Sequence, residues 1–167
     1  MGGSSGGGIP SDMLRKLEES AKQKLREAST DVSRHVFISF AYEDVADVNL
    51  LRGQAKNERS DLQFDDYSVR EAFDSANADY IKSQIRERID KTSVTVVYLS
   101  ADSAKSRWVN WEIEESLRRG KGVIGVYKGD APPATLPTAF AENGCKSVKW
   151  THDGLMKAIE DANQRRE

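Results

Sequence analysis

The sequence contains few cysteines and histidines, and this scarcity excludes two kinds of structural cross-link. Cys145 is the only cysteine among the 167 residues, so no disulfide can form within the chain, which fits a reducing compartment. With one cysteine and two histidines the chain cannot build a typical zinc site. We therefore expect no metal and no resident cofactor.

Long apolar runs and a large excess of one charge are also missing. No stretch of about 18 apolar residues occurs, so we expect no membrane span. The N-terminus lacks a basic region followed by an apolar stretch, so we expect no secretory signal and a cytoplasmic location. The formal net charge of −2 argues against a dedicated nucleic-acid binder, which normally carries a strong basic excess.

The composition that remains is typical of a globular protein, with 38% hydrophobic and 31% charged residues. We divide the chain into a flexible Gly/Ser-rich tail or linker over 1–10, an N-terminal helix over 11–33 and a folded domain over 34–167. The helix carries an apolar stripe at heptad-like spacing: Leu14, Leu17, Ala21, Leu25 and Ala28. This stripe predicts packing against either the domain or a partner helix.

Apolar strand patterns alternate with helical patterns through the rest of the chain. We expect strands at His35–Phe40, Leu62–Asp66, Ser93–Leu99, Val123–Tyr127 and Ser147–Trp150. We expect helices at Val45–Glu58, Ala78–Ile89, Arg107–Arg119 and His152–Gln164, and loops over 67–76 and 129–144. This alternation predicts a flavodoxin-like α/β fold of three layers, in which helices cover a five-stranded parallel sheet of order 2-1-3-4-5.

Ligands of such sheets bind at the carboxyl ends of the strands, near the switch between the first and third strands. The helix expected at Arg107–Arg119 begins beside the same edge. On a helical wheel its apolar residues Val109, Ile113 and Leu117 face the sheet, and Glu112 falls at the rim of that face. A partly desolvated carboxyl group there is expected to have a raised pKa.

Several segments resemble TIR domains. HVFISFAYED is similar to the first strand and loop of that family, and SADSAKSRWVNWEIEESLRRGKGVIGVY is similar to the exit of its third strand, the following helix and the fourth strand. With NLLRGQAKNE and FDDYSV, the pattern is similar to the bacterial TIR-like group that includes the NAD-consuming subunit of Thoeris anti-phage systems. In enzymatic members the helix carries a Trp followed four residues later by the catalytic Glu, here Trp108 and Glu112.

The resemblance implies an NAD+ glycohydrolase or ADP-ribose cyclase that acts in bacterial anti-phage defence, with NAD+ as its substrate. It implies that Glu112 is catalytic, that the protein forms a homo-oligomer, and that a diffusible nucleotide reaches a downstream effector. The substrate-binding candidates are Ser39, Phe40, Ala41, Tyr42, Asp66, Tyr67, Ser100 and Trp108.

Alternatives remain at this point. Glu112 could be a helix-surface acid paired with Arg107 or Arg119, within a non-catalytic interaction module. A receiver domain fits poorly, because the third strand ends in Leu99–Ser100 rather than in an Asp. The loop over 41–44 lacks the arginine that several TIR enzymes place near the NAD phosphates. Backbone amides, Lys105, Arg107 or a second protomer remain as phosphate-binding groups, and Glu114 and Glu115 are expected to be solvated.

Overall fold

The computed structural model describes residues 10–33, 35–57, 63–67 and 71–165. The chain divides into two compact units, Met1–Asp31 and Val32–Glu167. The first consists mainly of α1 (Ser11–Ser33), which exposes the apolar side chains of Met13, Leu14 and Leu17. Among the helices of the described part, none has the length and apolar character needed to cross a membrane.

The second unit is built on a parallel sheet of five strands in the order β2-β1-β3-β4-β5. The strands are β1 (His35–Ser39), β2 (Gln63–Asp65), β3 (Val94–Tyr98), β4 (Gly122–Tyr127) and β5 (Lys146–Lys149). This order confirms the flavodoxin-like topology expected from the sequence. It places β1 and β3 side by side at the centre of the sheet, so the loops that follow them emerge at the same edge.

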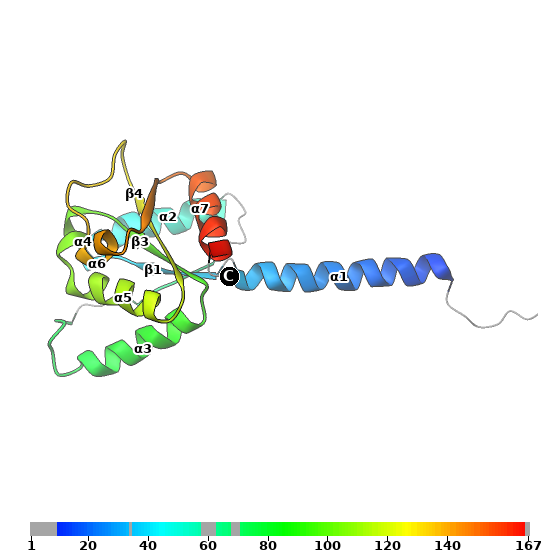
Figure 1. The fold of residues 1–167 in the computed structure, drawn as a ribbon, viewed down its shortest axis with the longest axis horizontal. Helices are drawn as coiled ribbons and strands as arrows, with labels where there is room; N and C mark the ends of the chain where they lie inside the picture. Colours follow the sequence, from blue (N-terminus) through cyan, green and yellow to red (C-terminus); the bar gives the residue numbers. More distant parts are fainter. Residues whose placement is uncertain (1–9, 34, 58–62, 68–70, 166–167) are drawn as a thin grey trace, which may run out of the picture. The chain divides into compact units, whose positions relative to one another are not determined.

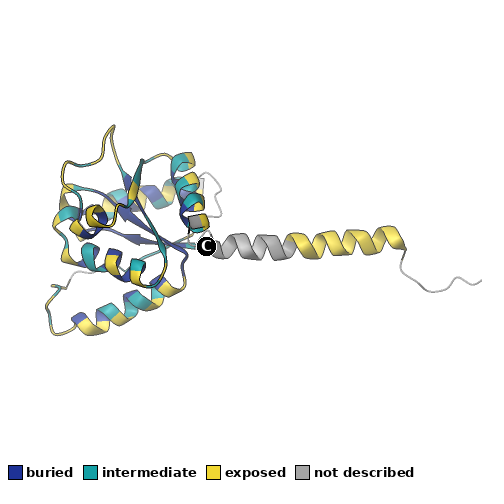
Figure 2. Cartoon of the chain, in the orientation of Figure 1, coloured by how far each residue is buried: buried dark blue, intermediate teal, exposed yellow. Residues whose placement is uncertain are grey.

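Helices cover both faces of the sheet (Figure 1). One face carries α2 (Val45–Asn57) and α7 (His152–Arg165), and the other carries α3 (Ala78–Asp90) and α5 (Arg107–Arg118). Figure 2 shows the consequence: the central strands β1 and β3 are mostly buried, while the helices expose their outer faces. The expected helix over Arg107–Arg119 therefore exists and packs on the sheet, where it can present side chains to the carboxyl edge.

The core has two sides because successive strand residues point to opposite faces. On β1, Val36 and Ile38 pack with α2 and α7, whereas Phe37 packs with Ile81 and Ile85 of α3. All of these side chains are at most 5% exposed. The alternation also fixes the direction of Ser39, which follows Phe37 by two residues and faces the α3/α5 side.

Three short elements were not predicted. The prediction of a loop over 129–144 was wrong in part, because the helix α6 (Thr138–Glu142) lies within this range and buries Phe140. The 3-10 helix η1 (Tyr42–Asp44) follows β1, and α4 (Ala101–Lys105) follows β3. Elements of one turn are too short to show a helical period, so only their tertiary contacts reveal them.

Candidate active site

Glu112 lies in the middle of the buried stripe of α5, and the expected position at the rim was wrong. Val109, Ile113 and Ser116 are fully buried on the same face, and Glu112 itself is only 3% exposed. These four positions are spaced by three and four residues and therefore share one face of a helix. The apolar residues alone outline only part of the buried face of α5, because Glu112 and Ser116 also belong to it.

The carboxyl group of Glu112 accepts a hydrogen bond from the hydroxyl of Ser39. Ser39 Oγ lies 3.1 Å from Glu112 Oε1, and both side chains are buried. Burial raises the pKa of Glu112 well above its ordinary value of 4.5, and the nearby carboxylate of Asp66 raises it further. The hydrogen bond from Ser39 opposes this shift without cancelling it. The raised pKa agrees with the direction expected from the sequence.

Hydrogen bonds next to Glu112 fix α5 on the sheet. Ser116 Oγ lies 2.7 Å from Thr95 Oγ1 on β3 and donates to the backbone oxygen of Glu112, also at 2.7 Å. Both hydroxyl groups are buried and satisfied. The turn of α5 that carries Glu112 is therefore held in one position relative to β1 and β3.

Glu115 was expected to be solvated, and this was wrong. Its side chain is 3% exposed and accepts from Arg86 at 3.0 Å, Arg118 at 2.8 Å and Arg119 at 3.1 Å. Burial alone would raise the pKa of Glu115, but hydrogen bonds from Arg119 and Arg86 outweigh it and lower that pKa. The result is an ion cluster that joins α5 to α3.

The cluster also decides between two interpretations of Glu112. Arg119 is bound to Glu115 and to Asp90, and Arg107 lies 3.5 Å from Asp74. Neither arginine forms an ion pair with Glu112, which is buried. The interpretation of Glu112 as a surface acid in a salt bridge is therefore wrong.

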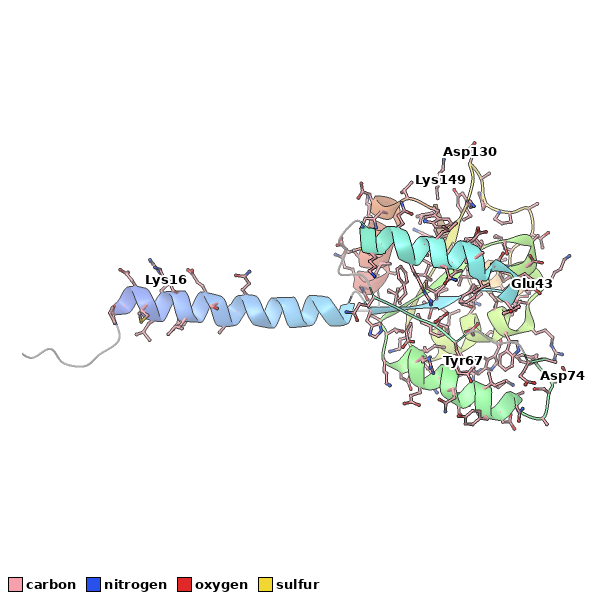
Figure 3. All side chains as sticks on the ribbon, turned by 180° about the vertical axis from the view of Figure 1, so that it is seen from behind. Lys16, Glu43, Tyr67, Asp74, Asp130 and Lys149 are labelled. Carbon is pink, nitrogen blue, oxygen red and sulfur yellow. The ribbon has the colours of Figure 1, made fainter. Side chains whose placement is uncertain are left out.

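A cleft of about 360 Å³ opens beside this part of α5. Its lining residues come from η1, the segment before α3, α4 and the start of α5: Tyr42, Glu43, Glu71, Asp102, Lys105, Ser106 and Trp108. Glu43 and Asp74 lie at the same end of the sheet domain (Figure 3), which is the end where the strands finish. The cleft thus occupies the carboxyl edge, where the topology places ligands.

Trp108 forms part of the cleft, whereas Glu112 does not line it. The indole Nε1 of Trp108 donates to the backbone oxygen of Glu71 at 2.8 Å, and the ring packs edge-on against Phe73 at 4.9 Å and Trp111 at 6.0 Å. Trp108 is 9% exposed. The Trp108–Glu71 contact therefore joins two of the residues that line the cleft.

Comparison with known proteins identifies the family. Residues 37–132 match the family model described as the Thoeris protein ThsB, TIR-like domain, which covers more than half of the chain. The chain belongs to the ThsB TIR-like domain family. It is 32% identical over 100 residues to a Bacillus cereus (strain MSX-D12) protein named "Putative cyclic ADP-D-ribose synthase ThsB1". That match covers 58% of this chain and 52% of the relative, so the chain spans about half the length of the curated relative.

One solved structure supports the fold of this TIR-like domain. The TIR domain of the Toll-related receptor TRR-2 from Hydra magnipapillata has a TM-score of 0.50 at 18% identity, over 78% of this chain and 94% of that domain. The TIR domains of the activated Roq1 resistosome reach a TM-score of 0.44 at 19% identity, over 79% of this chain and 82% of that one. The likeness to the TRR-2 domain supports the fold alone.

The TIR-like domain brings some of the expected substrate-binding residues together. Ser39 contacts Glu112, and Tyr42 and Trp108 line the cleft. Ala41 is buried and precedes η1. Tyr67 is half-buried and packs with the α3 side of the core, under the guanidinium of Arg88.

Other expected residues point elsewhere. Phe40 packs in the core on the α2/α7 face, opposite Glu112. Ser100 caps α4, accepting from Ser103 N and donating to Asp44. Asp66 lies 2.6 Å from Arg52 of α2, although its charge still acts on Glu112.

Sequence reasoning missed three acidic residues of the cleft, Glu43, Glu71 and Asp102. They come from three different elements, and only the fold makes them neighbours. No pattern in the sequence marks them, because isolated acids in polar loops are usually solvated. Among the described residues, no three carboxylate, imidazole or thiol side chains are grouped in a way that could hold a metal ion.

Proposed function

We propose that this chain cleaves the nicotinamide–ribose bond of NAD+ and releases ADP-ribose or a cyclic ADP-ribose as a nucleotide signal in bacterial anti-phage defence. We further propose that it acts as a homo-oligomer and that the signal reaches a downstream effector. Membership of the Thoeris TIR-like family and the name of the Bacillus cereus relative support this activity. The observation that carries it is a buried Glu112 bonded to Ser39 at the carboxyl end of β1.

The chemistry needs a carboxylate and no acid for the leaving group. Nicotinamide leaves as a neutral base, and positive charge develops on the ribose in an oxocarbenium-like transition state. A carboxylate fixed close to the ribose stabilises that charge most strongly where water is excluded. Glu112 is a fixed, water-excluded carboxyl group held by Ser39, and we assign this role to it.

The ionisation of Glu112 is coupled to substrate binding in this proposal. Burial keeps its pKa high in the free protein, which favours the neutral form. A cationic nicotinamide ring nearby favours the carboxylate instead, because an opposite charge lowers the pKa of an acid. Glu112 is then a negatively charged carboxylate only when the cationic ring is bound.

A second function, a non-catalytic interaction module of the TIR-like kind, is favoured by one observation. Glu112 is buried and does not line the cleft. Catalysis in this cleft therefore requires a rearrangement that brings the carboxyl group of Glu112 to the bound dinucleotide. An interaction module requires no such shift and leaves Glu112 as a buried structural acid.

The test compares NAD+ consumption by the full chain and by two variants, at protein concentrations that favour assembly. A fluorescent NAD+ analogue reports cleavage, and chromatography with mass analysis identifies the product. Glu112→Gln keeps the volume of the side chain and an oxygen to accept from Ser39, so it removes the charge alone. Glu114→Gln, at an exposed position of the same helix, is the matched control.

We expect Glu112→Gln to lower kcat by at least about a hundredfold, as expected for loss of a preorganised electrostatic group. Glu114→Gln should keep the activity of the parent. Equal turnover by both variants would remove Glu112 from the chemistry. No NAD+ loss from the parent in any assembly, together with a folded and associating protein, would favour the interaction module.

A further inference from the structure

The cleft beside Trp108 has an unbalanced set of charges. Its walls carry the carboxyl groups of Glu43, Glu71 and Asp102, and among the described lining residues only Lys105 is cationic. A carboxylate-rich cleft attracts cations and repels anions. The substrate in the proposed function contains both, a cationic nicotinamide ring and an anionic diphosphate. The diphosphate therefore needs a specific cation to enter this cleft.

Arg107 is close in sequence but already engaged. Its Nη1 lies 3.5 Å from Asp74 Oδ2, and its guanidinium carbon lies 4.6 Å from the centre of the Phe73 ring. Both contacts hold the side chain against the segment that precedes α3. Binding a phosphate with Arg107 would require giving up these contacts.

The cations of α3 are held in the same way. Lys82 Nζ lies 4.4 Å from the centre of the Phe73 ring, and Arg86 donates to Glu115 while its guanidinium lies 5.4 Å from the ring of Trp111. Stacking on an aromatic ring holds both cations, and Arg86 is fixed further by its pairing with a buried carboxylate. Arg86 thereby stabilises the contact between α3 and α5.

Two further arginines are paired with acids at the end of β2, Asp65 and Asp66. Arg52 Nη2 lies 2.6 Å from Asp66 Oδ1, and Arg88 Nε lies 3.5 Å from Asp65 Oδ1. Neither arginine lines the cleft. Each is committed to a carboxylate of the β2 segment, so neither is available for a phosphate in the cleft.

Lys105 is different from all of these cations. It is the last residue of α4, its side chain is exposed, and it lines the cleft together with Ser106 and Trp108. Among the described residues no carboxylate forms an ion pair with it. An ammonium group on a flexible stem binds phosphate as a point charge and needs no fixed fork geometry.

We propose that Lys105 binds the diphosphate of the dinucleotide. This inference rests on the proposed function and chooses among the phosphate-binding groups that the sequence leaves open. It makes Lys105 a substrate-binding residue. The cleft then favours ligands that carry a phosphate group.

The test measures binding rather than turnover, in the full chain carrying Glu112→Gln so that no ligand is consumed. Calorimetry compares two probes, NAD+ and nicotinamide riboside, which has the same cationic ring but no phosphate. We expect Lys105→Met to weaken NAD+ binding about tenfold, the size of one charge-assisted contact. Binding of nicotinamide riboside should stay unchanged. Lys105→Arg keeps the charge and should recover most of the affinity for NAD+.

Two controls test the alternatives. Lys157→Met removes an exposed lysine of α7, and Arg107→Met removes the neighbouring arginine of α5. Each should change the affinity for NAD+ by less than about twofold, since Lys157 is an exposed charge on α7, outside the cleft lining, and Arg107 is held by Asp74 and Phe73. An Arg107 variant that loses more affinity than the Lys105 variant would overturn the assignment.

The outcomes separate this inference from the proposed function. Equal NAD+ affinity with and without Lys105→Met would overturn the inference, and it would leave NAD+ cleavage by the parent unaffected. NAD+ that binds through Lys105 but is never cleaved would support the inference and remove the proposed function. A parent that binds neither probe would overturn both.

Discussion

The free energy of unfolding should depend on pH in a way that reports the ionisation of Glu112. Its pKa in the folded protein is raised, first by burial and then by Asp66, above the ordinary value of 4.5 expected in the unfolded chain. Between these two pKa values the folded protein holds a proton that the unfolded chain has lost. Stability therefore falls as pH rises through this window, and the loss is complete above the folded pKa.

Glu112→Gln removes this cost because an amide does not ionise. We expect the variant and the parent to be close in stability near pH 4.5, the ordinary pKa of the acid. Above it, the variant should gain on the parent by up to about 1.4 kcal/mol per pH unit, until the folded pKa is passed. The variant that removes the proposed catalytic group should thus be the more stable protein at neutral pH.

The assay is urea unfolding followed by circular dichroism at a series of pH values, with the same m-value required for both proteins. Subtracting the parent from the variant cancels the groups that titrate in both. Glu114→Gln, at an exposed position, should show no such pH-dependent difference. A Glu112→Gln difference that stays flat with pH, or that falls as pH rises, would refute the reasoning from burial.

Further predictions follow from the same contacts. Asp66→Asn should move the acid limb of the kcat/KM profile to lower pH, because Asp66 raises the pKa of Glu112. Ser39→Ala should move the same limb to higher pH, because the hydrogen bond from Ser39 lowers that pKa. An acid limb that stays in place in both variants would count against this. Glu115→Gln should destabilise the protein by about 1–3 kcal/mol at pH 7, with the difference shrinking as pH falls through the lowered pKa of Glu115, as measured by urea unfolding. Gly125→Ala should cost about 1–3 kcal/mol, since its Cβ would lie 2.6 Å from Phe140 and 2.7 Å from Leu99. In the same assay Gly53→Ala, which meets no atom within 4 Å, should be stabilising or neutral.

Much of the fold could be predicted from local patterns. The apolar segment Val94–Tyr98 is buried at every position, as expected of a central strand, and Gly122–Tyr127 pairs beside it. Alternation of such strands with helices leaves few topologies when crossovers are right-handed, so the strand order could be predicted from the sequence. The errors lay in η1, α4 and α6, where a single turn has no period to detect.

The candidate site was predicted in part, because the WVNWE segment marks Glu112 but not its surroundings. Burial of Glu112 depends on Ser39, 73 residues away, and burial of Glu115 depends on Arg86, 29 residues away. A glutamate carries no local signal of burial, since its polarity predicts a solvated side chain unless a distant partner is present.

The sequence by itself determined the α/β class and the sheet order, since periodicity and spacing are local properties of the chain, and its resemblance to TIR domains singled out Glu112 for the proposed chemistry. Only the tertiary structure decided that Glu112 is buried, that Phe40 turns to the other face, and that Lys105, the one cation among the described residues of the cleft, forms no ion pair with a described carboxylate. These properties depend on which segments meet at the end of the sheet. Charge and burial depend on the surroundings of a side chain, and packing brings those surroundings together from distant parts of the chain.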